Sequence, residues 1–89
     1  MNIEFAKSLS GHDSGQYYLV KEKDERFVYL VNGTTKPLAA PKKKNRKHIQ
    51  PVKTLPEDVL ECLNGELTDT AVKRAIKTYE RAVCGAQNH

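Results

Sequence analysis

The 89-residue sequence predicts a mainly β protein with a helical C-terminal part, in the form of a small five-stranded antiparallel barrel followed by two short helices. Up to residue 53, short runs of aromatic and β-branched residues alternate with tight turn signals, which is typical of small barrels. From residue 54 onward, the apolar residues instead recur with the period of amphipathic helices. A lysine-rich stretch at residues 41–48 lies near the end of the first part.

The first part of the chain has the pattern of several short strands joined by turns. Gly11 and Gly15 bracket short polar residues in a predicted turn, and Asn32-Gly33 is a strong hairpin signal because both residues tolerate positive φ angles. Pro37 and Pro41 keep the return strand after this turn short and at an edge of the sheet. The lysine-rich stretch then forms a long loop between the last two strands. We expect these strands near residues 3–9, 17–20, 27–31, 34–36 and 49–52.

Two helices are expected between residues 54 and 85. The first begins with Thr54-Leu55-Pro56-Glu57, which has the pattern of a capping box, and it ends at Asn64-Gly65. Thr68 caps the second helix and Gly85 ends it. Because two such short helices would be unstable alone, the apolar stripe of the second must pack on the barrel or on a partner. This stripe consists of Val72, Ala75, Ile76, Tyr79 and Val83.

These patterns define one small domain with an appended element, as a chain of this length suggests. Residues 1–53 form the barrel with its basic loop at 41–48, residues 54–85 form the helical extension, and residues 86–89 form a frayed tail. The longest apolar runs are far shorter than a membrane-spanning helix needs, and the N-terminus lacks the pattern of a signal peptide. We therefore expect a cytoplasmic protein with no membrane partner.

The positive charge of the chain is concentrated in one segment. The sequence has 15 Lys and Arg residues against 11 Asp and Glu residues, a net charge of +4. Seven basic residues and no acidic residue lie between Lys36 and Lys53, so the remainder of the chain has a net charge of 4 − 7 = −3. A concentrated cationic segment on a mildly acidic body suggests an edge that binds a polyanion.

Within this segment, Lys42, Lys43, Lys44, Arg46 and Lys47 cannot all be buried, because burying unpaired charges is prohibitive. They form either a solvated charge run or a phosphate-binding surface, and we favour phosphate binding, to which Lys36 adds a further charge. Arg46 and Asn45 also have side chains suited to base edges or to bidentate phosphate contacts. His48 could stack on a base or pack at the rim of the barrel.

The turn at residues 11–15 is a weaker candidate for phosphate contact. Gly11 and Gly15, with His12 between them, could expose backbone N–H groups to a phosphate, although a plain strand connection explains the same residues. Among the aromatic residues, we expect Phe27 and one member of each tyrosine pair in the core. Tyr17, Tyr18 and Tyr29 alternate in orientation along their strands, and an exposed tyrosine could stack on an unpaired base.

Catalytic chemistry finds little support in the sequence. The three histidines are scattered, and no order typical of a nucleophile with its base stands out. Cys62 and Cys84 are too few for a four-cysteine zinc site, and each is interpreted as a small apolar residue on a helix. We expect no enzymatic activity, no cofactor, no metal and no small-molecule substrate.

Two stretches of the sequence resemble the KOW family of RNA-binding domains. The stretch Ser10-Gly-His-Asp-Ser-Gly-Gln-Tyr-Tyr-Leu-Val20 looks like the KOW motif, in which a strand, a glycine-containing loop and a second strand are read together. Asn32-Gly33 and the later string Pro-Lys-Lys-Lys-Asn-Arg-Lys-His are similar to the continuation in small bacterial KOW-domain proteins. These proteins resemble archaeal and eukaryotic large-subunit ribosomal proteins of the fourteen-e, six-e and twenty-seven-e group.

The resemblance implies an SH3-like barrel that binds RNA, and ribosomal RNA or the large ribosomal subunit is the expected partner. The family loop commonly carries basic residues around its aspartate, whereas this chain has His12, Ser14 and Gln16 there, so RNA contact falls mainly on residues 42–48. The alternative is an adaptor that contacts a ribosomal or transcription protein through the helix around Ile76 and Tyr79. Binding to double-stranded DNA is less favoured, because no recognition helix carries the basic cluster.

Overall fold

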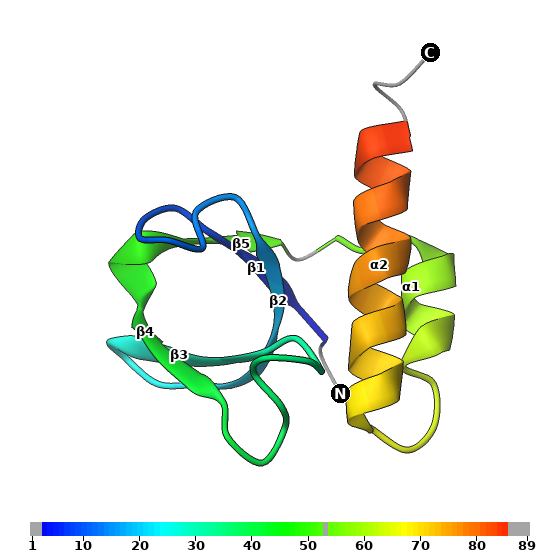
Figure 1. The fold of residues 1–89 in the computed structure, drawn as a ribbon, viewed down its shortest axis with the longest axis horizontal. Coiled ribbons are helices and arrows are strands. Elements are labelled where there is room, and N and C mark those ends of the chain that lie inside the picture. The colour runs from blue at the N-terminus through cyan, green and yellow to red at the C-terminus, as the bar shows by residue number, and fades with distance from the viewer. Residues whose placement is uncertain (1–2, 53, 86–89) are drawn as a thin grey trace.

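The computed structural model describes residues 3–52 and 54–85, which form one antiparallel sheet and two α-helices (Figure 1). The strand order in the sheet is β4-β3-β2-β1-β5, and the sheet curls into a barrel-like shape that stays open between β4 and β5. The predicted fold class, mainly β with a helical C-terminal part, is confirmed. The elements are β1 (Phe5–Ser8), β2 (Tyr17–Lys23), β3 (Phe27–Val31), β4 (Lys42–Asn45), the short 3-10 helix η1 (Arg46–His48), β5 (Ile49–Val52), α1 (Glu57–Cys62) and α2 (Asp69–Gly85).

Alternation along the strands gives the sheet two apolar faces and therefore two small cores. The inner face of the curled sheet buries Ala6, Tyr18, Val28, Leu30 and Ile49 against one another. The outer face is covered by the two helices, which lie along one side of the barrel (Figure 1). This second core consists of Phe5, Leu19 and Val31 from the sheet together with Val59, Leu63, Val72, Ala75 and Ile76 from the helices.

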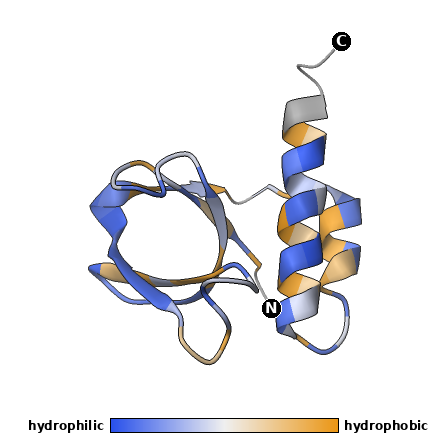
Figure 2. Cartoon of the chain, in the orientation of Figure 1, coloured by the Kyte–Doolittle hydropathy of each residue, from blue (hydrophilic) through white to orange (hydrophobic). Residues whose placement is uncertain are grey.

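The predicted apolar stripe of the second helix packs on the outer face of the sheet. Figure 2 shows apolar and polar residues interspersed along α2. Val72, Ala75 and Ile76 are buried. The ring of Tyr79 makes edge-to-face contacts with Phe5, at 5.5 Å between centroids, and with Tyr17, at 4.9 Å. Val83, nearer the end of the helix, is half-buried.

The turn at Asn32-Gly33 differs from the predicted hairpin. These residues begin a longer connection, residues 32–41, and the return strand expected at 34–36 does not form. The reason is that the Asn32 side-chain oxygen accepts hydrogen bonds from the backbone N–H groups of Thr34 and Lys36, both at 2.9 Å, in place of sheet pairing. Gly33, at a φ of 79°, lies so close to the start of α2 that a Cβ atom there would collide with the backbone oxygen of Asp69.

The prediction that residues 41–48 form a loop is also wrong, because most of this segment is regular secondary structure. Lys42–Asn45 is strand β4, which pairs antiparallel with β3 from Leu30↔Lys42 to Phe27↔Asn45, and η1 follows at once. The segment did not resemble a strand because its side chains are polar on both faces. The charged face that points inward is neutralised by an acid from another part of the chain, as described below.

The helix ends follow the predictions in part. The capping box at Thr54 is wrong: α1 begins after Pro56, whose backbone is extended, and no side chain caps it. Thr54 therefore lies outside the helix. Thr68 does cap α2, because its Oγ1 accepts a hydrogen bond from the Ala71 N–H at 3.1 Å, and α2 ends at Gly85. The tail predicted at residues 86–89 lies outside the described residues.

Cys62 fits the interpretation as a small apolar residue on a helix. It is half-buried at the end of α1 and packs against the core beneath the helices. Its Sγ lies 3.7 Å from the Thr78 hydroxyl of α2. The side chain of Cys84 lies outside the described part of the structure.

Candidate nucleic-acid interface

Strand β4 and helix η1 carry the predicted basic residues on the side of the barrel away from the helices (Figures 1 and 2). In a strand, successive side chains point to opposite faces of the sheet. Lys42 and Lys44 therefore point to one face and Lys43 points to the other. This alternation divides the lysine run into two groups with different environments.

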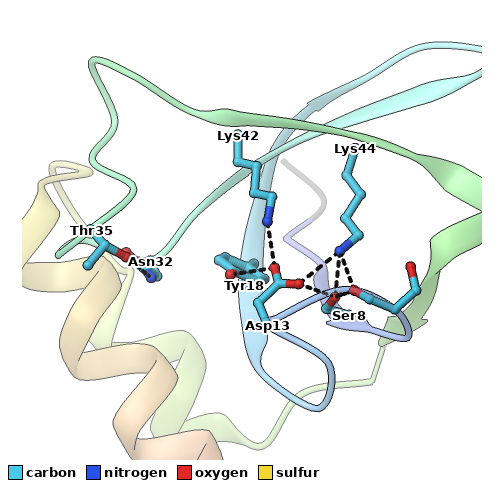
Figure 3. Close-up of polar contacts among 8 residues, drawn as sticks. Ser8, Asp13, Tyr18, Asn32, Thr35, Lys42 and Lys44 are labelled. Carbon is cyan, nitrogen blue, oxygen red and sulfur yellow. Dashed lines mark hydrogen bonds and ion pairs between the residues drawn. The ribbon is translucent and has the colours of Figure 1, made fainter.

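Lys42 and Lys44 converge on the carboxylate of Asp13, in the turn at residues 11–15 (Figure 3). The Lys42 ammonium lies 2.8 Å from Asp13 Oδ2, and the Lys44 ammonium lies 3.0 Å from Oδ1. Lys44 also donates to the hydroxyl oxygen of Ser8 at 2.7 Å and to the backbone carbonyl of Ser10 at 2.9 Å. The structure thus brings together the turn at residues 11–15 and the stretch at residues 42–48, two segments that were predicted to contact RNA. They contact each other through ion pairs and hydrogen bonds within the protein.

The Asp13 carboxylate receives further hydrogen bonds from the barrel interior. The buried Tyr18 hydroxyl donates to Oδ2 at 2.7 Å, and the Ser8 hydroxyl donates to Oδ1 at 2.9 Å. Burial alone would raise the pKa of Asp13, but the hydrogen bonds from Lys42, Tyr18, Lys44 and Ser8 outweigh it and hold the pKa far below its usual value. Burial and the neighbouring Asp13 charge raise the pKa of Tyr18 above its usual value. We call Ser8, Asp13, Tyr18, Lys42 and Lys44 the Asp13 cluster.

Solvent exposure separates the lysines of the cluster from the outward ones. The Lys44 side chain is 10% exposed, that of Asp13 is 12% exposed and that of Lys42 is 33% exposed, whereas Lys43, Arg46 and Lys47 are exposed residues. A phosphate that approached Lys44 would have to displace a buried carboxylate. Lys42 and Lys44 thus pair with an acid of the chain itself, whereas the outward basic residues of the run face solvent.

The outward basic residues are held in place by local contacts at the corner between β4 and η1. The Lys43 ammonium lies 4.2 Å from the centre of the Phe27 ring, and Arg46 Nη1 donates to the Asp24 carbonyl at 3.0 Å. Asn45 caps η1, because its side-chain oxygen accepts from the Lys47 N–H at 2.9 Å. That oxygen is thus already bonded, which leaves the amide N–H groups of Asn45 for contact with a base.

The remaining predicted site residues lie around this corner or apart from it. His48 is exposed at the end of η1, and its carbonyl accepts from the Leu9 N–H at 2.8 Å. Gly11 and Gly15 adopt positive φ angles, and His12 between them is exposed. Lys36 lies in the connection before β4 and is half-buried, and its N–H bonds to the Asn32 side chain. The turn at residues 11–15 presents an ion-paired carboxylate next to β4, which disfavours a phosphate there.

The aromatic residues divide by strand face. Tyr18 is buried in the barrel, whereas Tyr17 packs half-buried against Tyr79. Phe27 is half-buried on the outer face, beneath Lys43, and the expectation that it is a core residue is wrong. The reason is that the helices cover only part of that face, and Phe27 lies at the far end of β3 from the covered Val31. Phe27 and Tyr29 therefore lie beside the outward lysine, Lys43, which pairs with Tyr29 across the strands.

Two features of the surface were not found from the sequence. The first is the Asp13 cluster. In the sequence, only the spacing of Lys42 and Lys44, two positions apart, indicates that these lysines share a face, and it does so only if the segment is a strand. The second is a shallow groove between the sheet and α2, lined by Gln16, Tyr17, Lys73, Ile76 and Lys77 among others. Lys73 and Lys77 are exposed on α2, and this helix lies on the opposite side of the barrel from η1 (Figure 1).

The described residues contain no group of three or more His, Cys, Asp or Glu side chains placed to hold a metal ion. No helix within the described ranges is long and apolar enough to cross a membrane. No protein-family model matches the sequence, and a search of curated proteins finds no match.

Proposed function

We propose that this protein is a non-enzymatic RNA-binding module whose contact surface is the outward side of β4 and η1. The observation that carries the proposal is the division of the basic run. Asp13 neutralises part of it internally, while Lys43, Arg46 and Lys47 remain exposed on one corner of a small barrel. Exposed cations of this kind make phosphate contacts, which supply much of the affinity for nucleic acid.

Structured ribosomal RNA, in the cytoplasm and on the large ribosomal subunit, is the partner that we propose. The resemblance of residues 10–20 and 41–48 to KOW domains favours this partner, and the barrel-like sheet is compatible with it. Phe27 and Tyr29, half-exposed beside Lys43, add aromatic surface of the kind on which unpaired bases stack. Double-stranded DNA is less suited, because the basic residues lie on a strand and a single 3-10 turn, with no basic recognition helix.

The alternative of a protein adaptor that uses the apolar side of α2 has less support. Ile76 is buried, and Tyr79 packs on Phe5 and Tyr17. The surface that such an adaptor would use is therefore occupied by the protein's own sheet. An adaptor would require α2 to leave the barrel, at the loss of most of the outer core.

The proposal is tested by binding of the protein to ribosomal RNA over a series of salt concentrations. With about three or four phosphates engaged, log K should fall against log salt with a slope of roughly −2 to −3.5. Replacing Lys43, Arg46 and Lys47 by glutamine should weaken binding and flatten the slope. The double variant K73Q/K77Q, which removes two exposed lysines from the other side of the molecule, is the matched control and should bind like the wild type.

Sedimentation of a lysate through a sucrose gradient tests the ribosomal part of the proposal. We expect the wild-type protein to travel with the large subunit and the triple glutamine variant to stay at the top of the gradient. A salt-independent affinity, or a triple variant that binds like the wild type, would show that this corner is not an RNA-binding surface. Capture of protein partners from nuclease-treated extract without any RNA would favour the adaptor instead.

A further inference from the structure

One end of the barrel contains a cavity that the proposed RNA-binding surface does not use. Its volume is about 130 Å³, and it lies where inward residues of β2, β3 and β5 meet the start of η1. Val20, Val28 and Ile49 give it an apolar floor, since Val28 and Ile49 are buried members of the inner core. Glu4, Lys23 and Arg46 place charged groups around it.

The size of the cavity suits a single ring. An apolar cavity of about 150 Å³ in a protein holds one benzene molecule. A cavity of about 130 Å³ therefore matches one six-membered ring, the size of a pyrimidine base, and is small for a two-ring purine. The apolar floor suits the face of a base, which has no hydrogen-bonding groups.

The charged residues give the cavity a definite hydrogen-bonding pattern. Glu4 Oε1 accepts from the Lys23 ammonium at 2.9 Å, and the Glu4 side chain is only 16% exposed. The second carboxylate oxygen makes no hydrogen bond to the described residues. For a base whose position 4 faces Glu4, the carboxylate accepts a hydrogen bond from the amino group of cytosine but repels the O4 atom that uracil has at that position. Lys23 and Arg46 supply donors for the remaining acceptor atoms of the base.

Arg46 joins the cavity to the proposed RNA-binding surface. It lines the cavity and is also one of the three exposed cations at the corner of β4 and η1. A nucleotide whose phosphate is bound at this corner would therefore have the cavity within reach of its base. A double-stranded RNA could not fill the cavity, because its bases are paired and stacked.

We propose that this cavity binds one unpaired cytosine base of the RNA strand that Lys43, Arg46 and Lys47 hold, an inference that rests on the proposed function. The base enters with its face on Val28 and Ile49 and donates from its amino group to Glu4. The phosphate contacts give affinity for any RNA, and the cavity adds a preference for a single-stranded, cytosine-containing site.

The preference is measured with fluorescently labelled RNA hexamers of cytidine and of uridine, which carry the same number of phosphates. We expect the cytidine hexamer to bind roughly tenfold more tightly at the same salt slope, the discrimination that one base-edge contact supplies. In methyl NMR spectra, the signals of Val28 and Ile49 should shift with the cytidine hexamer and stay in place with the uridine hexamer. These comparisons use the wild-type protein, so they do not depend on whether a variant folds.

The variant E4Q replaces the carboxylate by an amide of the same shape, which can both donate and accept. We expect it to reduce the cytidine preference to about twofold or less, because the amide can satisfy uracil as well. E61Q, which changes an exposed glutamate on α1, is the matched control and should keep the preference.

Equal binding of the two hexamers, with the same salt slope and with unmoved Val28 and Ile49 signals, would overturn the cytosine site and leave the proposed RNA-binding surface intact. Tighter binding of an adenosine hexamer would also overturn it, because a purine exceeds the single-ring size. If no hexamer and no ribosomal RNA binds even at low salt, the proposed function falls together with the inference.

Discussion

The two sides of strand β4 contrast in their use of the same residue type. On one side, Lys42 and Lys44 are ion-paired to Asp13 and connect β4 to the turn between β1 and β2. On the other side, Lys43 lies over the ring of Phe27, and Lys47 follows in η1, exposed to solvent. The comparison shows that a run of positive charge is not one structural unit, because strand alternation places neighbouring lysines in internal ion pairs and on the exposed surface.

The largest effect is expected from D13N, which leaves the two lysines of the cluster without a counter-charge. Because Lys44 and Asp13 are mostly shielded from solvent, we expect a loss of about 2–3 kcal/mol in the free energy of unfolding. Urea unfolding followed by circular dichroism measures this loss. The control E25Q changes an exposed acid in the β2–β3 turn and should alter stability by less than about 0.5 kcal/mol. A D13N variant as stable as the wild type would mean that the cluster does not hold β4 to the turn.

The Asp13 cluster also predicts how the free energy of unfolding changes as the pH becomes acidic. The pKa of Asp13 in the folded protein is lower than in the unfolded chain, so its contribution is fully present above about pH 4 and is lost as the pH falls further. Urea titrations between about pH 5 and pH 2 should show the wild type losing more stability than D13N. Parallel curves for the two proteins would indicate that Asp13 is not ion-paired in solution.

A smaller effect is expected from Y18F, which removes one hydrogen bond to the carboxylate but keeps the aromatic ring in the inner core. We expect a loss of about 1–2 kcal/mol, as for other hydrogen bonds to charged groups. The folded pKa of Tyr18 lies above its ordinary value of 10.0, so its contribution is present below about pH 10 and is lost above it. The wild type should therefore lose stability above pH 10 more steeply than Y18F, and equal slopes would contradict the hydrogen bond to Asp13.

The smallest effect on stability is expected from a substitution on the outer face of the sheet, where Lys43 lies. F27L keeps an apolar side chain but removes the ring beneath Lys43, so we expect a stability loss of about 0.5–1 kcal/mol. RNA affinity should fall by about two- to fivefold, because Lys43 loses its support and a stacking surface is lost. Thermal unfolding and fluorescence anisotropy measure the two effects. A stability loss as large as that of D13N would remove the contrast between the two sides.

Much of the fold followed from local patterns, because they depend on neighbouring residues. Runs of aromatic and β-branched residues marked β2 and β3 as strands, and the 3.6-residue stripe of α2 marked the helix that packs on the sheet. Strand β4 was missed because both of its faces are polar, so it has no apolar alternation. The ion pairs between β4 and Asp13 span about 30 residues of chain, and no local pattern records such a contact.

The sequence predicted which segment carries the candidate site but not which of its lysines are exposed. The segment 42–48 does carry the exposed basic corner, as its charge indicated. Which lysines belong to it depended on knowing that the segment is a strand, since only then do Lys42 and Lys44 share a face. The cavity beside Arg46 depends on inward residues from three strands and could not be inferred before the strand pairing was known.

The central claim is that the two sides of β4 have separate roles, and exchanging matched pairs of lysines tests it most directly. K42Q/K44Q and K43Q/K47Q each remove two positive charges from the same seven-residue segment. The measurement is the salt dependence of ribosomal RNA binding by each folded variant, at a temperature at which unfolding measurements show both to be native. The account predicts that K43Q/K47Q flattens the slope of log K against log salt by about 1.5–2, whereas K42Q/K44Q changes it by less than about 0.5. Equal flattening by both pairs would contradict the account, because all four lysines would then contact phosphate.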